Sequence, residues 1–311
     1  MTPQHATLTR SAAFASIAMA LFLGLLKGWA VWRTGSTAML GSLADTALDF
    51  VASLATLAGV WVAAQPADES HRFGHGKAEA LSAMFQVILI VLSGAAIAFR
   101  AVVRLVEGGR VEAAEQGIAV SAIAILATLA LLAWQRHVIR QTGSLAIRTD
   151  NVHYKSDLLL NLAVIAALVI DQYLGFQRAD PLFGLGIAGW LLWGAWRASR
   201  EAVDNLMDRE WPEEKRLRFI ECAARHPELQ RLHDLRTRTS GHLDFAQFHV
   251  DLPEDMTVGE AHEIIERVEE DLCREFPGIE LVIHVDPEGH VDEPDNPLVE
   301  ADQFGKLESK P

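Results

Sequence analysis

The sequence has few cysteines and fewer basic than acidic residues, and we expect no cleavable signal peptide. Its two cysteines, Cys222 and Cys273, lie far apart, and we interpret both as reduced thiols rather than as a disulfide pair. Acidic residues outnumber basic ones by 41 to 27, and the resulting net charge of −14 argues against nucleic acid, whose phosphates require a basic surface. Residues 1–32 contain a long apolar run without a small-residue cleavage motif, so we expect a retained membrane span there.

The deficit of positive charge is confined to one end of the chain. Residues 1–210 contain 16 acidic and 16 basic residues, whereas residues 211–311 contain 25 acidic and 11 basic ones. Hydrophobic residues make up 50% of the whole sequence, which is high for an entirely soluble chain. We therefore expect a neutral membrane domain over residues 1–207, an acidic soluble domain over residues 208–288, and a disordered acidic tail over residues 289–311.

Six segments are apolar and long enough to cross a bilayer, which takes about 20 residues. They cover residues 12–32, 39–64, 80–105, 117–136, 146–173 and 180–200. Basic residues are modestly enriched in the links that share a side with both termini, and this bias places the termini and the acidic domain in the cytoplasm.

The second of these segments contains two acids, Asp45 and Asp49, where hydrocarbon is expected. Each charged residue near the centre of a spanning helix costs about 2.5–3.5 kcal/mol. A spacing of four places both carboxylates on one helix face, where they repel each other. A cation held between them reverses both penalties.

The fifth segment repeats this spacing with His153 and Asp157. Neither helix offers a basic residue that neutralises the acids, because the spacing of Lys155 points it away from the pair. One imidazole and three carboxylates form a four-ligand set that suits a tetrahedral divalent metal ion, Zn²⁺ above all.

The link after the second segment, QPADESHRFGHGKAEA, offers a second possible site. Asp68, His71 and His75 are spaced three and four residues apart, and Gly74 and Gly76 permit the tight turn that a chelating loop needs. A solvated charged loop is the alternative interpretation.

The acidic domain is predicted to have the element order α-β-β-α-β, an open-faced sandwich of two helices on a three-stranded sheet. A turn at Ser240-Gly241 joins the first two strands, and Thr257 with Glu260 forms a capping box before the second helix. Five potential metal ligands fall on these elements, and scattered surface histidines are the alternative reading; the five are His233, His249, His262, His284 and Asp286.

Five stretches carry a family resemblance: GSTAMLGSLADTALD, PADESHRFGHGKAEAL, RTDNVHYKSDLLLN, LMDRE and LHDLRTRTSG. Over residues 8–287 the chain resembles the cation diffusion facilitator family, and in particular its bacterial zinc and ferrous-iron efflux branch. The pairing of D-x-x-x-D with H-x-x-x-D on the second and fifth spans, with FGHGKAE between them, is highly specific.

The resemblance implies three metal sites. Asp45, Asp49, His153 and Asp157 would form the transport site, and Asp68, His71 and His75 a site in the cytoplasmic loop. His233, His249, His262, His284 and Asp286 would form a binuclear site in which Asp286 bridges two ions. The sequence departs from the family's pattern at Val285, where close relatives often carry glutamine.

The resemblance also implies a homodimer in the bacterial inner membrane, surrounded by lipid, with Lys77 and Asp208 forming a charged interlock near the membrane surface. We predict a Zn²⁺/H⁺ antiporter that exports metal by alternating access, with protons as the counter-ion. A passive divalent metal channel and a membrane-anchored metal sensor are the alternatives. An enzyme is not suggested, since no nucleophile or substrate pocket is apparent, and the donor types also accept Cd²⁺, Fe²⁺, Mn²⁺ and Co²⁺.

Overall fold

A computed structural model describes residues 3–34, 37–107, 115–174, 178–229, 231–241, 243–289 and 302–304. The chain divides into two compact units, Met1–Asp204 and Asn205–Pro311. Each unit is built around its own packed elements, and each is considered separately below.

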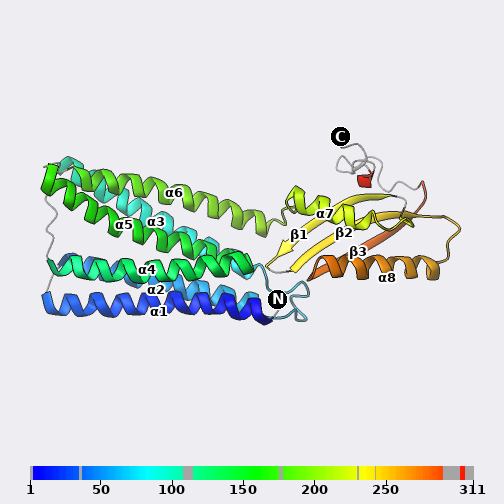
Figure 1. The fold of residues 1–311 in the computed structure, drawn as a ribbon, viewed down its shortest axis with the longest axis horizontal. Helices are drawn as coiled ribbons and strands as arrows, with labels where there is room; N and C mark the ends of the chain where they lie inside the picture. Colours follow the sequence, from blue (N-terminus) through cyan, green and yellow to red (C-terminus); the bar gives the residue numbers. More distant parts are fainter. Residues whose placement is uncertain are drawn as a thin grey trace. The chain divides into compact units, whose positions relative to one another are not determined.

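The first unit consists of long helices that run side by side (Figure 1). The described residues contain six of them, each between 27 and 32 residues long: α1 (Pro3–Thr34), α2 (Thr37–Ala63), α3 (Ala78–Glu107), α4 (Glu115–Thr142), α5 (Leu145–Leu174) and α6 (Ala179–Leu206). At a rise of 1.5 Å per residue, each exceeds the ~30 Å of a hydrocarbon core. Within the described residues, four contain a stretch apolar enough to span: Thr7–Arg33, Thr46–Ala63, Ala78–Val106 and Ala122–Thr142. The prediction of six spans stays a prediction.

The junction between α4 and α5 shows how local chemistry sets helix ends. Gly143 has φ +65° and its N–H bonds the Ile139 carbonyl at 2.9 Å, which ends α4 in the left-handed conformation that favours glycine. The carboxylate of Glu79, in the first turn of α3, accepts hydrogen bonds from Ser144 Oγ at 2.7 Å and from the Leu145 N–H at 3.0 Å. A buried acid from α3 therefore caps the start of α5.

Helices α2 and α3 approach closely at Gly59. A Cβ at this position would lie 2.3 Å from Ser82 Cβ and 3.2 Å from the Ala78 carbonyl oxygen. Ser82 Oγ also donates a hydrogen bond to the Ala55 carbonyl at 2.8 Å. The absence of a side chain at Gly59 thus allows a backbone contact that any larger residue would block.

The second unit is a small α+β domain (Figure 1). Its elements are α7 (Glu213–Ala223), β1 (Leu232–Ser240), β2 (Leu243–Leu252), α8 (Val258–Glu275) and β3 (Ile279–Pro287). The predicted order α-β-β-α-β is the order observed. The sheet order is β1-β2-β3, with β1 and β2 antiparallel and β2 and β3 parallel, as expected when α8 crosses over between the latter two.

Local signals in this unit act as the sequence predicts. Gly241 takes φ +63° between β1 and β2, and Ser240 pairs with Leu243. Thr257 and Glu260 form the expected capping box at the start of α8: the Thr257 N–H bonds Glu260 Oε2 at 2.9 Å, and the Glu260 N–H bonds Thr257 Oγ1 at 3.3 Å.

The two faces of the sheet differ sharply. Ala246, Phe248 and Val250 of β2 are buried in an apolar core to which both α7 and α8 contribute. Because side chains alternate along a strand, His249 and Asp251 of β2 lie on the opposite face. The four candidate metal ligands on the strands therefore gather on the sheet face that does not carry the helical core, whereas His262 belongs to α8.

Most of the predicted tail, residues 290–301 and 305–311, lies outside the described residues. Within residues 302–304, Gln303 is buried and Phe304 packs against the core of the second unit.

Candidate metal sites

Three clusters of metal-ligating side chains occur among the described residues, and in each the ligand atoms lie within 4.8 Å of one another. They are Asp49, His153 and Asp157 in the helical unit; Asp68, His71 and His75 in the link between α2 and α3; and His233, His249 and Asp286 in the sheet unit. All nine were candidates from the sequence.

The helical cluster joins α2 to α5. His153 Nε2 lies 2.9 Å from Asp49 Oδ1 and 3.8 Å from Asp157 Oδ2. The side chains of His153 and Asp49 are only 9% and 14% exposed, while that of Asp157 is 28% exposed. Asp45 lies in α2 one turn before Asp49, but its side chain is outside the described residues.

A basic residue approaches this region from a third helix. Lys27 in α1 donates a hydrogen bond to Thr46 Oγ1 at 2.7 Å, and Thr46 directly follows Asp45 in α2. Residue spacing along α2 and α5 does not reveal a basic residue on α1, so Lys27 was not among the sequence candidates.

The link cluster is more exposed and is shaped by a turn. His71 Nδ1 lies 3.2 Å from Asp68 Oδ1, and His75 Nε2 lies 3.4 Å from Asp68 Oδ2. His75 Nδ1 is 3.2 Å from the Pro66 carbonyl oxygen, to which it donates, so the lone pair of the ring lies on Nε2, the atom that faces Asp68. Gly74 takes φ +76°, as the predicted tight turn requires.

Backbone N–H groups also stabilise the ionised form of Asp68 in this link. The N–H groups of His71 and Ser70 donate to Asp68 Oδ1 at 2.6 and 2.9 Å and hold the pKa of the Asp68 carboxyl below its usual range. Asp68 is therefore ionised at neutral pH, as a metal ligand must be.

The sheet cluster is built by strand register. His233 of β1 is the cross-strand partner of His249 of β2, which in turn is the partner of His284 of β3. Asp286 is 97% buried and contacts all three: its Oδ2 lies 2.8 Å from His249 Nδ1 and 3.6 Å from His233 Nε2, and its Oδ1 lies 3.2 Å from His284 Nε2. Two oxygens of one buried carboxylate thus face separate histidines.

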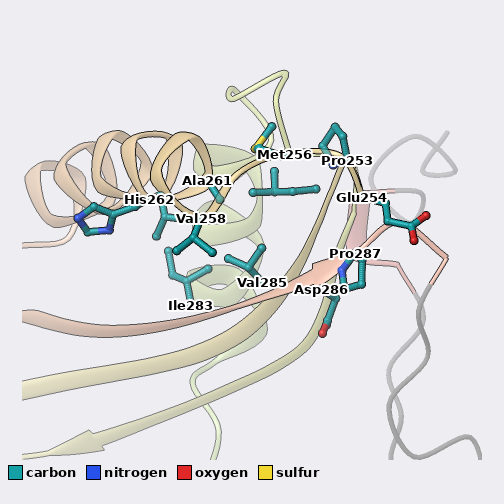
Figure 2. A pocket seen from close by; sticks show the side chains of 12 residues that line it. Pro253, Glu254, Met256, Val258, Ala261, His262, Ile283, Val285, Asp286 and Pro287 are labelled. Carbon is teal, nitrogen blue, oxygen red and sulfur yellow. The ribbon is translucent and has the colours of Figure 1, made fainter.

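His262 does not join this cluster. It is an exposed residue of α8 and lines an apolar groove between α8 and β3, together with Ile283 and Val285. Figure 2 shows His262 and Asp286 toward opposite ends of this groove, with their side chains pointing apart. The place of His262 in a five-residue site remains a prediction.

Asp251, a fully buried acid of the same region, was not among the sequence candidates. Its Oδ1 lies 3.1 Å from His233 Nε2, and its Oδ2 lies 3.2 Å from Arg231 Nη1. The signal was present, since residues 249–251 and 284–286 both read His-Val-Asp. The parallel register pairs the two triplets residue by residue, so Asp251 lies beside Asp286.

The last two candidates, Lys77 and Asp208, belong to different units of the chain. Within its own unit, Asp208 Oδ1 lies 3.5 Å from Arg238 Nη1. The interlock between Lys77 and Asp208 stays a prediction.

Comparisons with known proteins connect this geometry to a family. The description "Cation efflux transmembrane domain" matches residues 13–207, and "Cation efflux protein, cytoplasmic domain" matches residues 211–288. The chain is 42% identical over 287 residues to the cation-efflux pump FieF of Klebsiella pneumoniae subsp. pneumoniae and, to the same extent, to that of Serratia proteamaculans; each alignment covers 92% of this chain and 95% of the relative. A solved structure of a putative zinc transporter, CzrB, in its zinc form is 38% identical over 27% of this chain and 98% of its own, with a TM-score of 0.25.

Both domain descriptions and the relatives that align over nearly the whole chain give the same answer. The chain is an integral membrane protein of the cation diffusion facilitator family, a transporter of metal cations and not an enzyme.

Proposed function

We propose that this protein exports Zn²⁺ from the cytoplasm in exchange for protons by alternating access. The observation that carries the proposal is the cluster of Asp49, His153 and Asp157, which joins two long helices through side chains that are mostly buried. Asp45, one turn before Asp49, is the proposed fourth ligand. One nitrogen and three oxygens suit tetrahedral Zn²⁺, and Cd²⁺ and Fe²⁺ accept the same donors.

Proton coupling follows from the chemistry of these ligands. Carboxylates and imidazole must lose their protons to bind a metal ion, so metal and protons compete for the same groups. His153 Nε2 faces Asp49 and Asp157, so a proton on this atom supplies part of the positive charge that leaves with the metal, and protons on the carboxylates supply the rest. Protonation on the far side of the membrane then expels the ion and leaves a site that can return without it.

The remaining assignments complete the proposed transporter. It spans the bacterial inner membrane six times with both termini in the cytoplasm, and it works as a homodimer in which Lys77 and Asp208 interlock near the membrane surface. Asp68, His71 and His75 bind an ion in the cytoplasmic link. In the sheet unit, Asp286 bridges two ions held by His233, His249, His262 and His284, and these ions stabilise the transport-competent dimer when cytoplasmic metal rises.

Removal of one ligand tests the site. In everted vesicles, Asp157→Ala should abolish Zn²⁺ uptake, while Lys155→Ala, an exposed position two residues away on the same helix, should leave it intact. Size-exclusion chromatography should show the dimer in both variants. Transport by Asp157→Ala at the parental rate would refute the assignment.

A passive channel is the rival that the same vesicles can exclude. A closed cage of ligands binds too tightly for fast conduction, and channel flux needs no counter-ion. Zn²⁺, Cd²⁺, Fe²⁺ and Mn²⁺ should therefore be compared with and without a proton gradient. Zn²⁺ uptake that does not respond to the gradient would favour the channel.

A further inference from the structure

One turn before His153, α5 carries an acid that the proposed mechanism does not use. Asp150 is fully buried, and its carboxylate accepts hydrogen bonds from three other helices. Ser16 Oγ of α1 donates to Oδ2 at 2.6 Å, Gln135 Nε2 of α4 donates to Oδ2 at 2.7 Å, and Thr56 Oγ1 of α2 lies 3.5 Å from Oδ1. A single side chain of α5 is thus tied to α1, α2 and α4.

The residue after His153 makes a second set of ties to the same helices. Tyr154 is 1% exposed, and its hydroxyl donates to the Ser16 carbonyl oxygen at 2.9 Å and lies 3.0 Å from Ser53 Oγ of α2. Ser53 follows Asp49 by one helical turn. The contact between Asp49 and His153 is therefore bordered by hydrogen bonds that join the same two helices.

These groups form one connected network. Gln135 Nε2 also lies 3.0 Å from Ser16 Oγ, and Gln135 Oε1 accepts a hydrogen bond from Asn151 Nδ2 at 3.0 Å. Gln86 Nε2 of α3 also donates to Thr56 Oγ1. We call this network the Asp150 hub; its members, all of them at most 5% exposed, are Ser16, Ser53, Thr56, Gln86, Gln135, Asp150, Asn151 and Tyr154.

A hub of this kind restricts α5 in a way that apolar packing does not. Apolar helix faces tolerate small slips and rotations, whereas a buried hydrogen-bond network is satisfied in one arrangement and costly in others. A metal cage needs its ligands placed within about 0.5 Å. His153 lies between Asp150 and Tyr154, so rotation or sliding of α5 would break hub bonds before it moved the ligand far.

We propose that Asp150 is a positioning residue of the transport site: through Ser16, Thr56 and Gln135 it fixes the depth and rotation of α5, and so holds His153 and Asp157 against Asp49. This inference rests on the proposed function, because it concerns the same metal site. It assigns Asp150 no contact with the metal.

Replacement of Asp150 by asparagine distinguishes a positioning role of this side chain from a role for its negative charge. Asp150→Asn keeps one oxygen for Ser16 and Gln135, and its amide can face Thr56 Oγ1, which accepts hydrogen bonds. Asp150→Ala removes both acceptors. A positioning role predicts that asparagine restores what alanine loses, whereas a role for the charge or for a bound proton predicts that both variants fail alike.

Vesicles that contain the full-length protein provide the test, with Zn²⁺ and Mn²⁺ as probes. Asp150→Ala should raise the KM for Zn²⁺ by about tenfold, the size of effect seen when supporting groups of metal ligands are removed, and should lower the preference for Zn²⁺ over Mn²⁺. Asp150→Asn should stay within about twofold of the parent in both quantities. Ser82→Ala, which removes a hydrogen bond between α2 and α3 outside the hub, is the matched control and should change neither.

Ser16→Ala keeps the inference testable if Asp150→Ala fails to fold. Ser16→Ala deletes one hydroxyl and should shift the KM for Zn²⁺ and the metal preference in the same direction as Asp150→Ala. Where the Asp150→Ala protein folds, the double variant Ser16→Ala/Asp150→Ala should have a KM no higher than that of Asp150→Ala alone. An unchanged KM in Ser16→Ala, or an Asp150→Asn protein as impaired as Asp150→Ala, would overturn the proposal. Failure of the proposed transport function would be distinguished from failure of this inference, because the parent protein itself would then show no saturable Zn²⁺ flux.

Discussion

Replacement of Asp251 by asparagine should loosen the sheet unit without changing its shape. Asp251 has no solvent exposure, and its two oxygens contact Arg231 Nη1 at 3.2 Å and His233 Nε2 at 3.1 Å. Asparagine has nearly the same volume, so no cavity forms. What is lost is the negative charge that both partners face.

The size of the loss can be worked out from these contacts. A hydrogen bond to a charged group contributes about 1.5–3 kcal/mol. The side chain of Arg231 is 40% exposed, so water compensates part of its loss. Removal of the charge also relieves repulsion with the neighbouring buried Asp286, so the lower end of the range applies. We expect a destabilisation of about 2 kcal/mol, which corresponds to roughly a 30-fold change in an equilibrium constant.

Hydrogen exchange read by mass spectrometry on the full-length protein, without added metal, measures this change locally. Peptides that cover Leu243–Leu252 and Ile279–Pro287 should exchange about 30-fold faster in Asp251→Asn, and peptides from α1 to α4 should not change. Glu228→Gln is the control, because its partner Arg267 is 56% exposed and such surface pairs contribute little. If the two strands exchange within threefold of the parental rate, the buried charge does not stabilise the sheet as argued.

Two further substitutions probe the helical unit. Glu79→Ala removes the acceptor of the Leu145 N–H and of Ser144 Oγ. The backbone amides in the first turn of α5 should then exchange hydrogen about tenfold faster, as expected for the loss of a cap that contributes about 1–2 kcal/mol. An unchanged exchange rate would show that Glu79 does not cap the helix. Gly59→Ala places a methyl group 2.3 Å from Ser82 Cβ, and the melting temperature of the detergent-solubilised protein should fall by about 5 °C or more. Ser82→Gly in the same chain should restore part of this loss; a double variant as unstable as Gly59→Ala would place the clash elsewhere.

Features with a local signal could be predicted from the sequence. The capping box of Thr257, the turn at Gly241 and the order of elements in the sheet unit depend on residues a few positions apart, and the structure contains all of them. Asp49, His153 and Asp157 stood out for a different reason, because charges within apolar segments are costly. An energetic anomaly is visible without a structure.

Features that depend on distant pairing were not visible. Asp150 resembles the other polar residues at the start of its helix, and only the structure brings Ser16 and Gln135 to it from 134 and 15 residues away. The role of Asp251 depends on strand register, because the two His-Val-Asp triplets lie side by side only when β2 and β3 pair in parallel. Lys27 approaches Thr46 through the packing of α1 on α2, which sequence spacing does not describe.

The strand register of the sheet unit would also let an ion at the proposed site stabilise the fold of that unit. His249 and Asp286 are 37 residues apart in the chain, and α8 lies between them. An ion shared by these two side chains needs both of them in place, so it binds the folded unit and not the unfolded chain, and at an ion concentration 100 times its Kd it would stabilise the fold by about 2.7 kcal/mol. The free energy of unfolding of this unit would then rise and fall with the concentration of free metal around it.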